Sequence, residues 1–223
     1  MAQNETSLYN LALSSAGTRS RISSPGEQSR EAEICRLWYE PVRRQILRAA
    51  PWASAKAMSR LALKAEQTET DWIDGSPNPK FRYAYALPSK YLQARYLFDY
   101  ARFDIGLLSS NETALMTSSE NVVLYYTFDQ TEIATWDADL YLAIALALAA
   151  YICLPLNGKT SQARSAQQQA NGMIYSAREA AANESYEPVD MAPEWIAGRG
   201  SAYGSPGVRY IYPSGPLIAV PNV

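Results

Sequence analysis

Apolar residues recur every three to four positions in several stretches of the first 186 residues, a spacing typical of helices that pack through one face. In the clearest stretch, Ile34, Trp38, Val42 and Ile46 follow one another at four-residue intervals. Similar stripes occur before and after it. The pattern predicts helices at about 5–17, 25–50, 131–155 and 160–184.

Short signals indicate where the first two helices end, begin and bend. Gly17 follows the first stripe and is a natural C-cap. Ser24 and Glu27 have the spacing of a capping box around Pro25, so the second helix is expected to begin there. Pro41 lies inside this helix and is expected to kink it or divide it in two.

The middle of the chain has a different period. Residues 81–88 alternate bulky with small or polar side chains and end at a proline, as half-buried strands do. Further strand candidates lie at 92–97, 114–117 and 122–126. The predicted fold class is α+β. It comprises an antiparallel helical bundle body over residues 1–186, a small antiparallel β insertion at about 57–130, and an extended C-terminal arm over 187–223.

The C-terminal arm, residues 187–223, differs in composition from the rest of the chain. It contains six of the 13 prolines and five of the 11 glycines, so regular helix is not expected there. Disordered tails usually lack aromatic and aliphatic residues, but this arm keeps them. We therefore expect it to order against a partner. The side chains expected to bind that partner are Trp195, Tyr203, Tyr210, Tyr212, Leu217 and Ile218.

The segment 140–156 carries no charge and could suggest a membrane span. It is rich in alanine, is slightly short for a span, and has no flanking cluster of Lys or Arg. A buried helix is the favoured interpretation, packed against 160–184 and the first two helices. The N-terminus has neither the basic nor the long apolar region of a signal peptide, so none is predicted.

The chain has 223 residues, a formal net charge of −2 and no histidine. Without histidine, Ser-His-Asp and Cys-His triads and histidine-ligated metal sites are excluded. The sequence contains no phosphate-binding glycine motif and no CxxC pair, so we expect no cofactor and no metal. Cys35 and Cys153 are expected to be buried free thiols, with one disulfide as the alternative.

A carboxylate pair of the glycosidase type is the remaining enzymatic option. No spacing singles out any acid, so no catalytic residue is predicted and a non-enzymatic role is favoured. A virion-associated glycan or peptidoglycan hydrolase stays open as the alternative. The acidic residues near aromatic side chains are Glu33, Glu40, Asp71, Glu132, Asp137 and Glu194.

Two features could indicate nucleic-acid binding. Arg36, Arg43, Arg44 and Arg48 lie off the apolar stripe of the second helix, but interspersed glutamates favour a salt-bridged helix face. The Tyr-rich strand at 81–87 could stack bases, yet its alternation fits cross-strand packing equally well.

Several short motifs occur in an order known from one protein family. Residues 39–47 (YEPVRRQIL) and 50–55 (APWASA) are followed by 83–89 (YAYALPS) and then by Leu92 and Arg95. In this order they resemble the head-to-tail adaptor, or tail tubular, proteins of short-tailed bacteriophages. The chain departs from the family's pattern at Ser54, Phe81 and Lys90.

The resemblance implies a structural role in a virion. Such a subunit forms a ring with copies of itself, commonly twelve, between the portal protein and the tail nozzle protein. The ring continues the channel for double-stranded DNA and contacts it without sequence specificity. The resemblance also implies that the subunit is assembled in the host cytoplasm, resides in the virion tail or neck, and does not contact a membrane.

Overall fold

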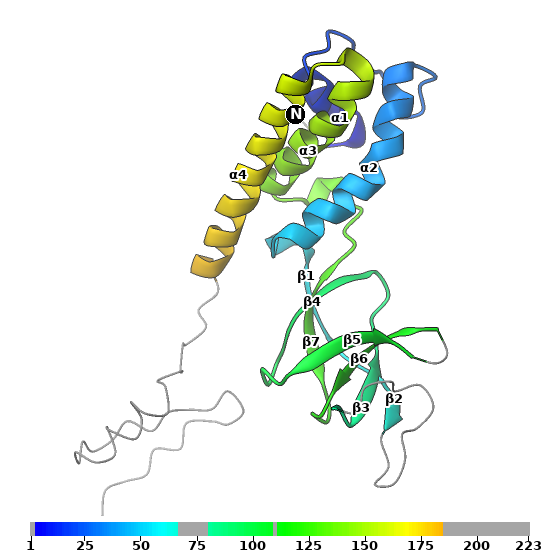
Figure 1. The fold of residues 1–223 in the computed structure, drawn as a ribbon, viewed down its shortest axis with the longest axis vertical. Helices are drawn as coiled ribbons and strands as arrows, with labels where there is room; N and C mark the ends of the chain where they lie inside the picture. The colour runs from blue at the N-terminus through cyan, green and yellow to red at the C-terminus, as the bar shows by residue number, and fades with distance from the viewer. Residues whose placement is uncertain (1–2, 67–79, 109–110, 185–223) are drawn as a thin grey trace, which may run out of the picture. The chain divides into compact units, whose positions relative to one another are not determined.

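The computed structural model describes residues 3–66, 80–108 and 111–184 (Figure 1). Within these ranges the chain forms four α-helices and seven β-strands, with two short 3-10 helices at Ala53–Ala55 and Ile133–Thr135. The helices are α1 (Glu5–Ser15), α2 (Arg30–Ala49), α3 (Ala138–Asn157) and α4 (Thr160–Glu184). The strands are β1 (Lys56–Arg60), β2 (Leu63–Glu66), β3 (Tyr83–Ala86), β4 (Tyr91–Leu97), β5 (Phe103–Leu107), β6 (Thr113–Thr117) and β7 (Val123–Phe128).

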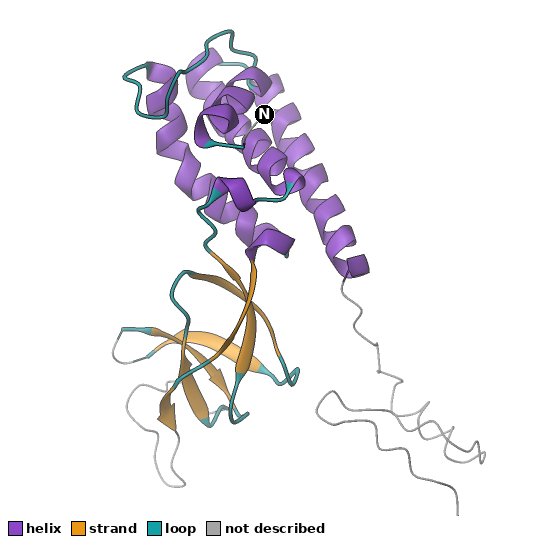
Figure 2. Ribbon diagram, turned by 180° about the vertical axis from the view of Figure 1, so that it is seen from behind, coloured by secondary structure: helices purple, strands orange, loops and turns teal. Residues whose placement is uncertain are grey.

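The fold is mixed α+β, but the predicted helical bundle body with a small β insertion is wrong. The described strands form two antiparallel sheets of three and four strands and make up about 22% of the structure (Figure 2). The predicted strands did not include β5, although Phe103, Ile105 and Leu107 alternate with Asp104 and Gly106 as strand residues do. The strands are therefore a principal part of the fold.

Local capping explains where α1 begins and ends. The side chain of Asn4 accepts a hydrogen bond from the backbone N–H of Ser7 at 2.8 Å, which satisfies a free donor of the first turn. After α1, Gly17 has a φ of 74°, a left-handed backbone conformation that residues with a Cβ rarely adopt. The predicted stop at Gly17 is confirmed.

The start of α2 differs from the prediction. The helix begins at Arg30, capped by Ser29, instead of at about residue 25. The Glu27 carboxylate accepts hydrogen bonds from the backbone and hydroxyl of Ser23, which lowers the pKa of Glu27. These bonds close a local turn and do not cap a helix. Farther along, α2 continues through Pro41 to Ala49 without the predicted division.

Helix α3 lies at the centre of the helical part, in contact with α1, α2 and α4 (Figure 1). By length and composition it is the single described helix that could cross a membrane, and 56% of its most apolar window is buried inside the structure. Its many alanines, of which Ala147 is 2% exposed, let neighbouring backbones approach closely. The predicted packing of segment 140–156 against the other helices is confirmed. Cys35 and Cys153 are both buried and free, also as predicted.

Two short sheets share a core. In the three-stranded sheet the order is β1-β7-β4, and in the four-stranded sheet it is β2-β3-β6-β5. Leu97 and Leu124 from the first sheet join Leu115 from the second in one buried cluster. Successive residues of a strand face opposite sides of the sheet. The residues next to the inward-facing ones on β1, β4 and β7 therefore lie on the outer face of the three-stranded sheet.

Candidate functional site

Several motif residues of α2, among them Val42, Ile46 and Leu47, lie in the helical core. The rings of Tyr39 and Tyr9 meet edge to face at 5.4 Å, and burial raises the pKa of Tyr39 to about 12. The indole N–H of Trp52 donates to the carbonyl oxygen of Ile46 at 2.8 Å and fixes the chain where it leaves α2. These residues hold the helices together.

A buried ion pair joins α2 to the segment after β7. Arg43 is 4% exposed and donates to the Asp129 carboxylate and, at 3.0 Å, to the carbonyl oxygen of Gln130. Arg44 also donates to Asp129, at 3.2 Å. Arg43 was predicted on a salt-bridged helix face with the interspersed glutamates. Arg44 does pair with Glu40 there, but Arg43 is buried and its acid partner lies 86 residues away in sequence.

Two arginines satisfy the C-terminal carbonyl groups of α2. Arg95 of β4 donates to the carbonyl oxygen of Ala50 at 2.8 Å and to the hydroxyl of Thr127 at 2.8 Å. Arg178 of α4 donates twice to the carbonyl oxygen of Ala49, at 2.9 and 2.7 Å. Positive charge at a helix C-terminus stabilises the helix dipole. Burial, and the nearby charge of Arg178, lower the pKa of Arg95.

Tyr83 and Tyr85, from the motif at 83–89, lie mostly buried on β3. The Tyr83 hydroxyl donates to the Glu120 carboxylate at 2.6 Å, and this bond raises the pKa of Tyr83 to about 12. The Tyr85 hydroxyl donates to the carbonyl oxygen of Ser119 at 2.9 Å. The two tyrosines therefore anchor the turn before β7, in keeping with cross-strand packing.

Several acids considered for catalysis hold the fold together. Glu40 pairs with Arg44 at 3.0 Å on the surface of α2. Asp137 accepts from the backbone N–H and hydroxyl of Ser54, at 3.1 and 3.0 Å, and so ties the turn after α2 to the start of α3. The Ser54 departure from the family pattern thus has a structural role.

Four other acids complete that set. Glu33 and Glu132 are exposed, and Asp71 and Glu194 lie outside the described residues. Asp129, although absent from the predicted set, is the described acid most enclosed by cations. In the ranges that the structure covers, no group of three or more acids and cysteines is placed to hold a metal ion.

The predicted partner-binding side chains of the arm lie beyond the described part of the chain. Their interactions therefore stay a prediction. The residues concerned are Trp195, Tyr203, Tyr210, Tyr212, Leu217 and Ile218.

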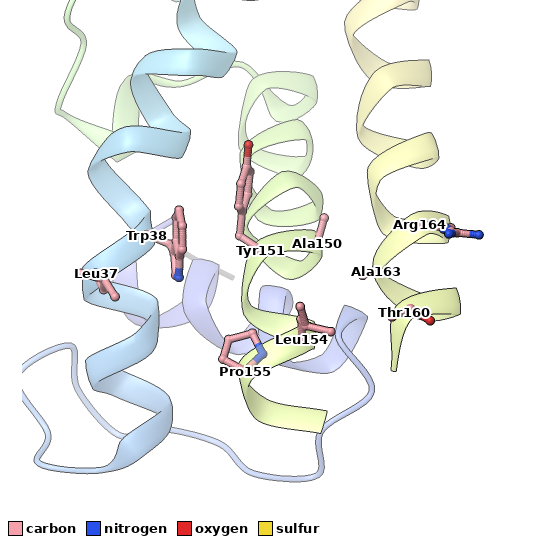
Figure 3. A pocket seen from close by; sticks show the side chains of 9 residues that line it. All are labelled: Leu37, Trp38, Ala150, Tyr151, Leu154, Pro155, Thr160, Ala163 and Arg164. Carbon is pink, nitrogen blue, oxygen red and sulfur yellow. The ribbon is translucent and has the colours of Figure 1, made fainter. Parts of the chain in front are cut away.

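An apolar groove of about 730 Å³ lies over α3 between α2 and α4, and we call it the helical groove (Figure 3). Leu37 of α2 and Leu154 of α3 lie at this groove and are 68% and 56% exposed. Leu37 extends the apolar stripe of α2 but stays exposed, because no described element covers this side of the helix. The lining residues are Leu37, Trp38, Ala150, Tyr151, Leu154, Pro155, Thr160, Ala163 and Arg164.

The wall of the helical groove is held in place by aromatic stacking. Trp38 and Tyr151 lie side by side between α2 and α3, with ring centroids 5.0 Å apart and planes 21° apart (Figure 3). The Tyr151 hydroxyl donates to the side chain of Gln45 at 3.0 Å. At the Pro155 end, Arg30 donates to the carbonyl oxygen of Pro155 at 2.8 Å, so a guanidinium group is fixed there.

A second apolar surface crosses the outer face of the three-stranded sheet. Met58, Tyr125 and Tyr96 lie directly opposite one another on β1, β7 and β4. Tyr96 stacks on Tyr125 at 4.6 Å and on Tyr100 at 5.5 Å. Met58 is 60% exposed and Tyr100 is 50% exposed. We call Met58, Tyr125, Tyr96 and Tyr100 the tyrosine row.

Both surfaces were missed at the level of sequence, although each left a signal. Leu37 and Trp38 are adjacent, so they widen the apolar stripe beyond the width that one neighbouring helix covers. Tyr96 lies in β4 beside Leu97, which fills the inward position, and Tyr100 follows the strand. In both cases the helix or strand has more large apolar residues than inward-facing positions. This excess was the signal that some of them form an exposed surface.

Comparison with known proteins adds no family to this description. No model of a known protein family matches the chain, and no curated protein matches it either.

Proposed function

We propose that this chain is a structural connector subunit that forms a ring between the portal protein and the tail nozzle protein of a short-tailed bacteriophage. In this role it joins head to tail and continues the channel for DNA. The observation that carries the proposal is the presence of two different exposed apolar surfaces, the helical groove and the tyrosine row, on one subunit.

Ring geometry explains why two surfaces matter. In a closed ring of more than two copies, each subunit contacts its neighbours through two different patches, one on each side. Contiguous exposed apolar patches mark protein interfaces more often than isolated apolar residues do. The helical groove and the tyrosine row come from different elements, α2, α3 and α4 in one case and β1, β4 and β7 in the other.

The roles of the motif residues support the same function. Trp52, Tyr83 and Arg95 stabilise helix ends and turns through hydrogen bonds to the chain itself. A sequence resemblance that depends on such residues indicates a shared scaffold, and function then depends on what the surfaces bind. A ring subunit requires a rigid scaffold and complementary surfaces.

Assembly on the portal tests the proposal. The full chain is produced together with the portal protein of its phage and examined by electron microscopy. Wild-type chain is expected to form closed rings on the portal. Met58→Asp, which places a charge in the tyrosine row, is expected to prevent ring closure without unfolding the chain, because Met58 is largely exposed. Gln169→Glu on the exposed side of α4 is the matched control and should assemble normally.

Two outcomes would contradict the proposal. One is a chain that stays monomeric in the presence of the portal protein. The other is hydrolysis of peptidoglycan or capsule in a zymogram that one Glu→Ala or Asp→Ala substitution abolishes with the fold intact. That second result would establish the hydrolase.

A further inference from the structure

The helical groove lacks a cover, and the shape of the groove restricts what can cover it. Its floor is the apolar face of α3 at Tyr151 and Leu154, and Leu37 projects from α2 beside it (Figure 3). Grooves of this kind bind a short segment through a few apolar anchors. The occupant therefore needs apolar side chains close together in sequence.

Charge around the groove favours an acidic occupant. Arg30 is held at one end by its bond to the carbonyl oxygen of Pro155, and Arg164 lies on the rim, with its side chain directed away from Leu154 (Figure 3). Lys159 precedes the lining residue Thr160 and is exposed. No acid is among the lining residues. Along α2 the acids nearest to Leu37 are Glu40, three residues after it and paired with Arg44, and Glu33, one turn before it.

The chain itself contains a segment of this chemistry beyond the described residues. Between residues 187 and 196 the sequence EPVDMAPEWI has three acids, no Lys or Arg, and four large apolar residues. The acids are Glu187, Asp190 and Glu194, and the apolar residues are Val189, Met191, Trp195 and Ile196.

Helix length decides which copy supplies the segment. Helix α4 has 25 residues and the groove contacts only its first turns, so Glu184 lies about 30 Å along the helix from Arg164. Fully extended, the six residues from Glu184 to Asp190 span at most about 20 Å. Residues up to Asp190 are therefore too far from the groove of their own chain, although Trp195 and Ile196, at most about 40 Å from Glu184, could reach it. Only a second copy can place the whole segment in the groove.

We infer that the helical groove binds residues 187–196 of a second copy of this chain. This inference rests on the proposed ring, which places a neighbouring copy beside each subunit, and it names the contact that links them. Apolar residues of the segment contact Leu37, Tyr151 and Leu154, and its acids face the cations at the groove's ends. Residues after 196 remain available to the portal protein.

A peptide-binding experiment on the full chain tests this contact directly. The probe is a synthetic peptide of residues 186–198 with a fluorescent label, and its binding is followed by anisotropy. Wild-type chain is expected to bind it saturably. Leu37→Glu should weaken binding at least about tenfold, because the added carboxylate repels the acidic peptide, whereas Leu37→Arg should retain most of it. Both substitutions are made at the same exposed position, so their effects on folding are matched.

Three controls separate the effect of the added charge from the effect of its position. Gln169→Glu adds the same charge on α4 away from the groove and should leave binding unchanged. A peptide with Glu187, Asp190 and Glu194 changed to Gln should bind more weakly than the natural one. A photo-crosslinker at Leu154 in the full chain, with isotope-labelled and unlabelled copies mixed, should join residues 187–196 to the groove between copies and not within one.

The inference is overturned if the peptide fails to bind, if Leu37→Glu and Leu37→Arg weaken binding equally, or if the crosslinks join other segments. Rings that assemble on the portal despite such a result would leave the proposed function intact. Peptide binding without ring assembly would instead contradict the proposed function and keep this contact as an association between copies.

Discussion

The helices bury their apolar side chains around α3, whereas the strands bury theirs between two thin sheets. Around α3 many of the buried residues are alanines, packed among leucines and isoleucines, and three other helices contact it. In the strands the core is formed by a few leucines and tyrosines, and the outer face of the three-stranded sheet carries the tyrosine row. The helical part therefore tolerates change poorly in its interior, and the strand part has more room to adjust.

Ala147→Arg is expected to have the largest effect on stability. The substitution forces a charged side chain into the packed surroundings of α3, where Ala147 is 2% exposed. We expect a loss of about 4 kcal/mol in the free energy of unfolding, measured by chemical denaturation. Ser165→Arg on the exposed side of α4 is the control and should change stability by less than about 0.5 kcal/mol. Equal losses would show that α3 is not the centre of the core.

Arg43→Met tests the connection between the two regions. It leaves Asp129 with only the longer contact from Arg44, so we expect a loss of about 3 kcal/mol. Asp129→Asn in the same chain should restore part of that loss, because no uncompensated buried charge remains. A double mutant that is less stable than Arg43→Met would contradict the pairing.

Matched leucine truncations compare the two cores. Leu148 in α3 and Leu124 in β7 are both fully buried. Leu148→Ala is expected to cost about 3 kcal/mol and Leu124→Ala about 2 kcal/mol, because a sheet with one open face relaxes more readily into a cavity. Denaturation of both variants gives the difference. A larger cost for Leu124→Ala would reverse the comparison.

Tyr39→Phe is expected to have a small effect that depends on pH. Burial raises the pKa of Tyr39 from 10.0 to about 12, so the folded state keeps the phenol protonated. This contribution is fully present below pH 10 and is lost as the pH rises through about 12, since the unfolded state releases the proton first. Removing the hydroxyl should reduce the stability lost between pH 10 and about 12 by about 1 kcal/mol. This value allows for solvent screening at a partly exposed ring.

Thermal unfolding at several pH values between 8 and about 12 measures this loss of stability. At pH 7 the variant should unfold at nearly the wild-type temperature. An unchanged alkaline slope would show that Tyr39 does not contribute to it.

The helical periodicity predicted the interior of α2 and α3 well. Val42 and Ile46 are buried, and the stop at Gly17 is correct, because these features depend on residues close in sequence. The partner of Arg43 and the pairing of β1 with β7 depend on residues about 60 to 90 positions apart, and no local pattern specifies them. For the same reason the weight of the strands in the fold was underestimated.

The candidate surfaces could be predicted only in part. Periodicity identifies Leu37 as apolar, but whether it is buried depends on which helix lies opposite, and none of the described helices does. The tyrosine row requires the register of β1, β7 and β4, which sets Met58 beside Tyr125 and Tyr96. The side chains expected to act in the arm lie outside the described residues and stay a prediction.

The central claim is that this chain forms a ring between head and tail, and imaging the phage particle tests it most directly. Cryo-electron microscopy of virions that carry the chain, resolved well enough to place α3 and α4, should show a closed ring between portal and nozzle around the DNA channel. The helical groove of each copy should face a neighbouring copy. The account would be contradicted if the chain were missing from the neck of the particle, or if it were present there without contacts between copies.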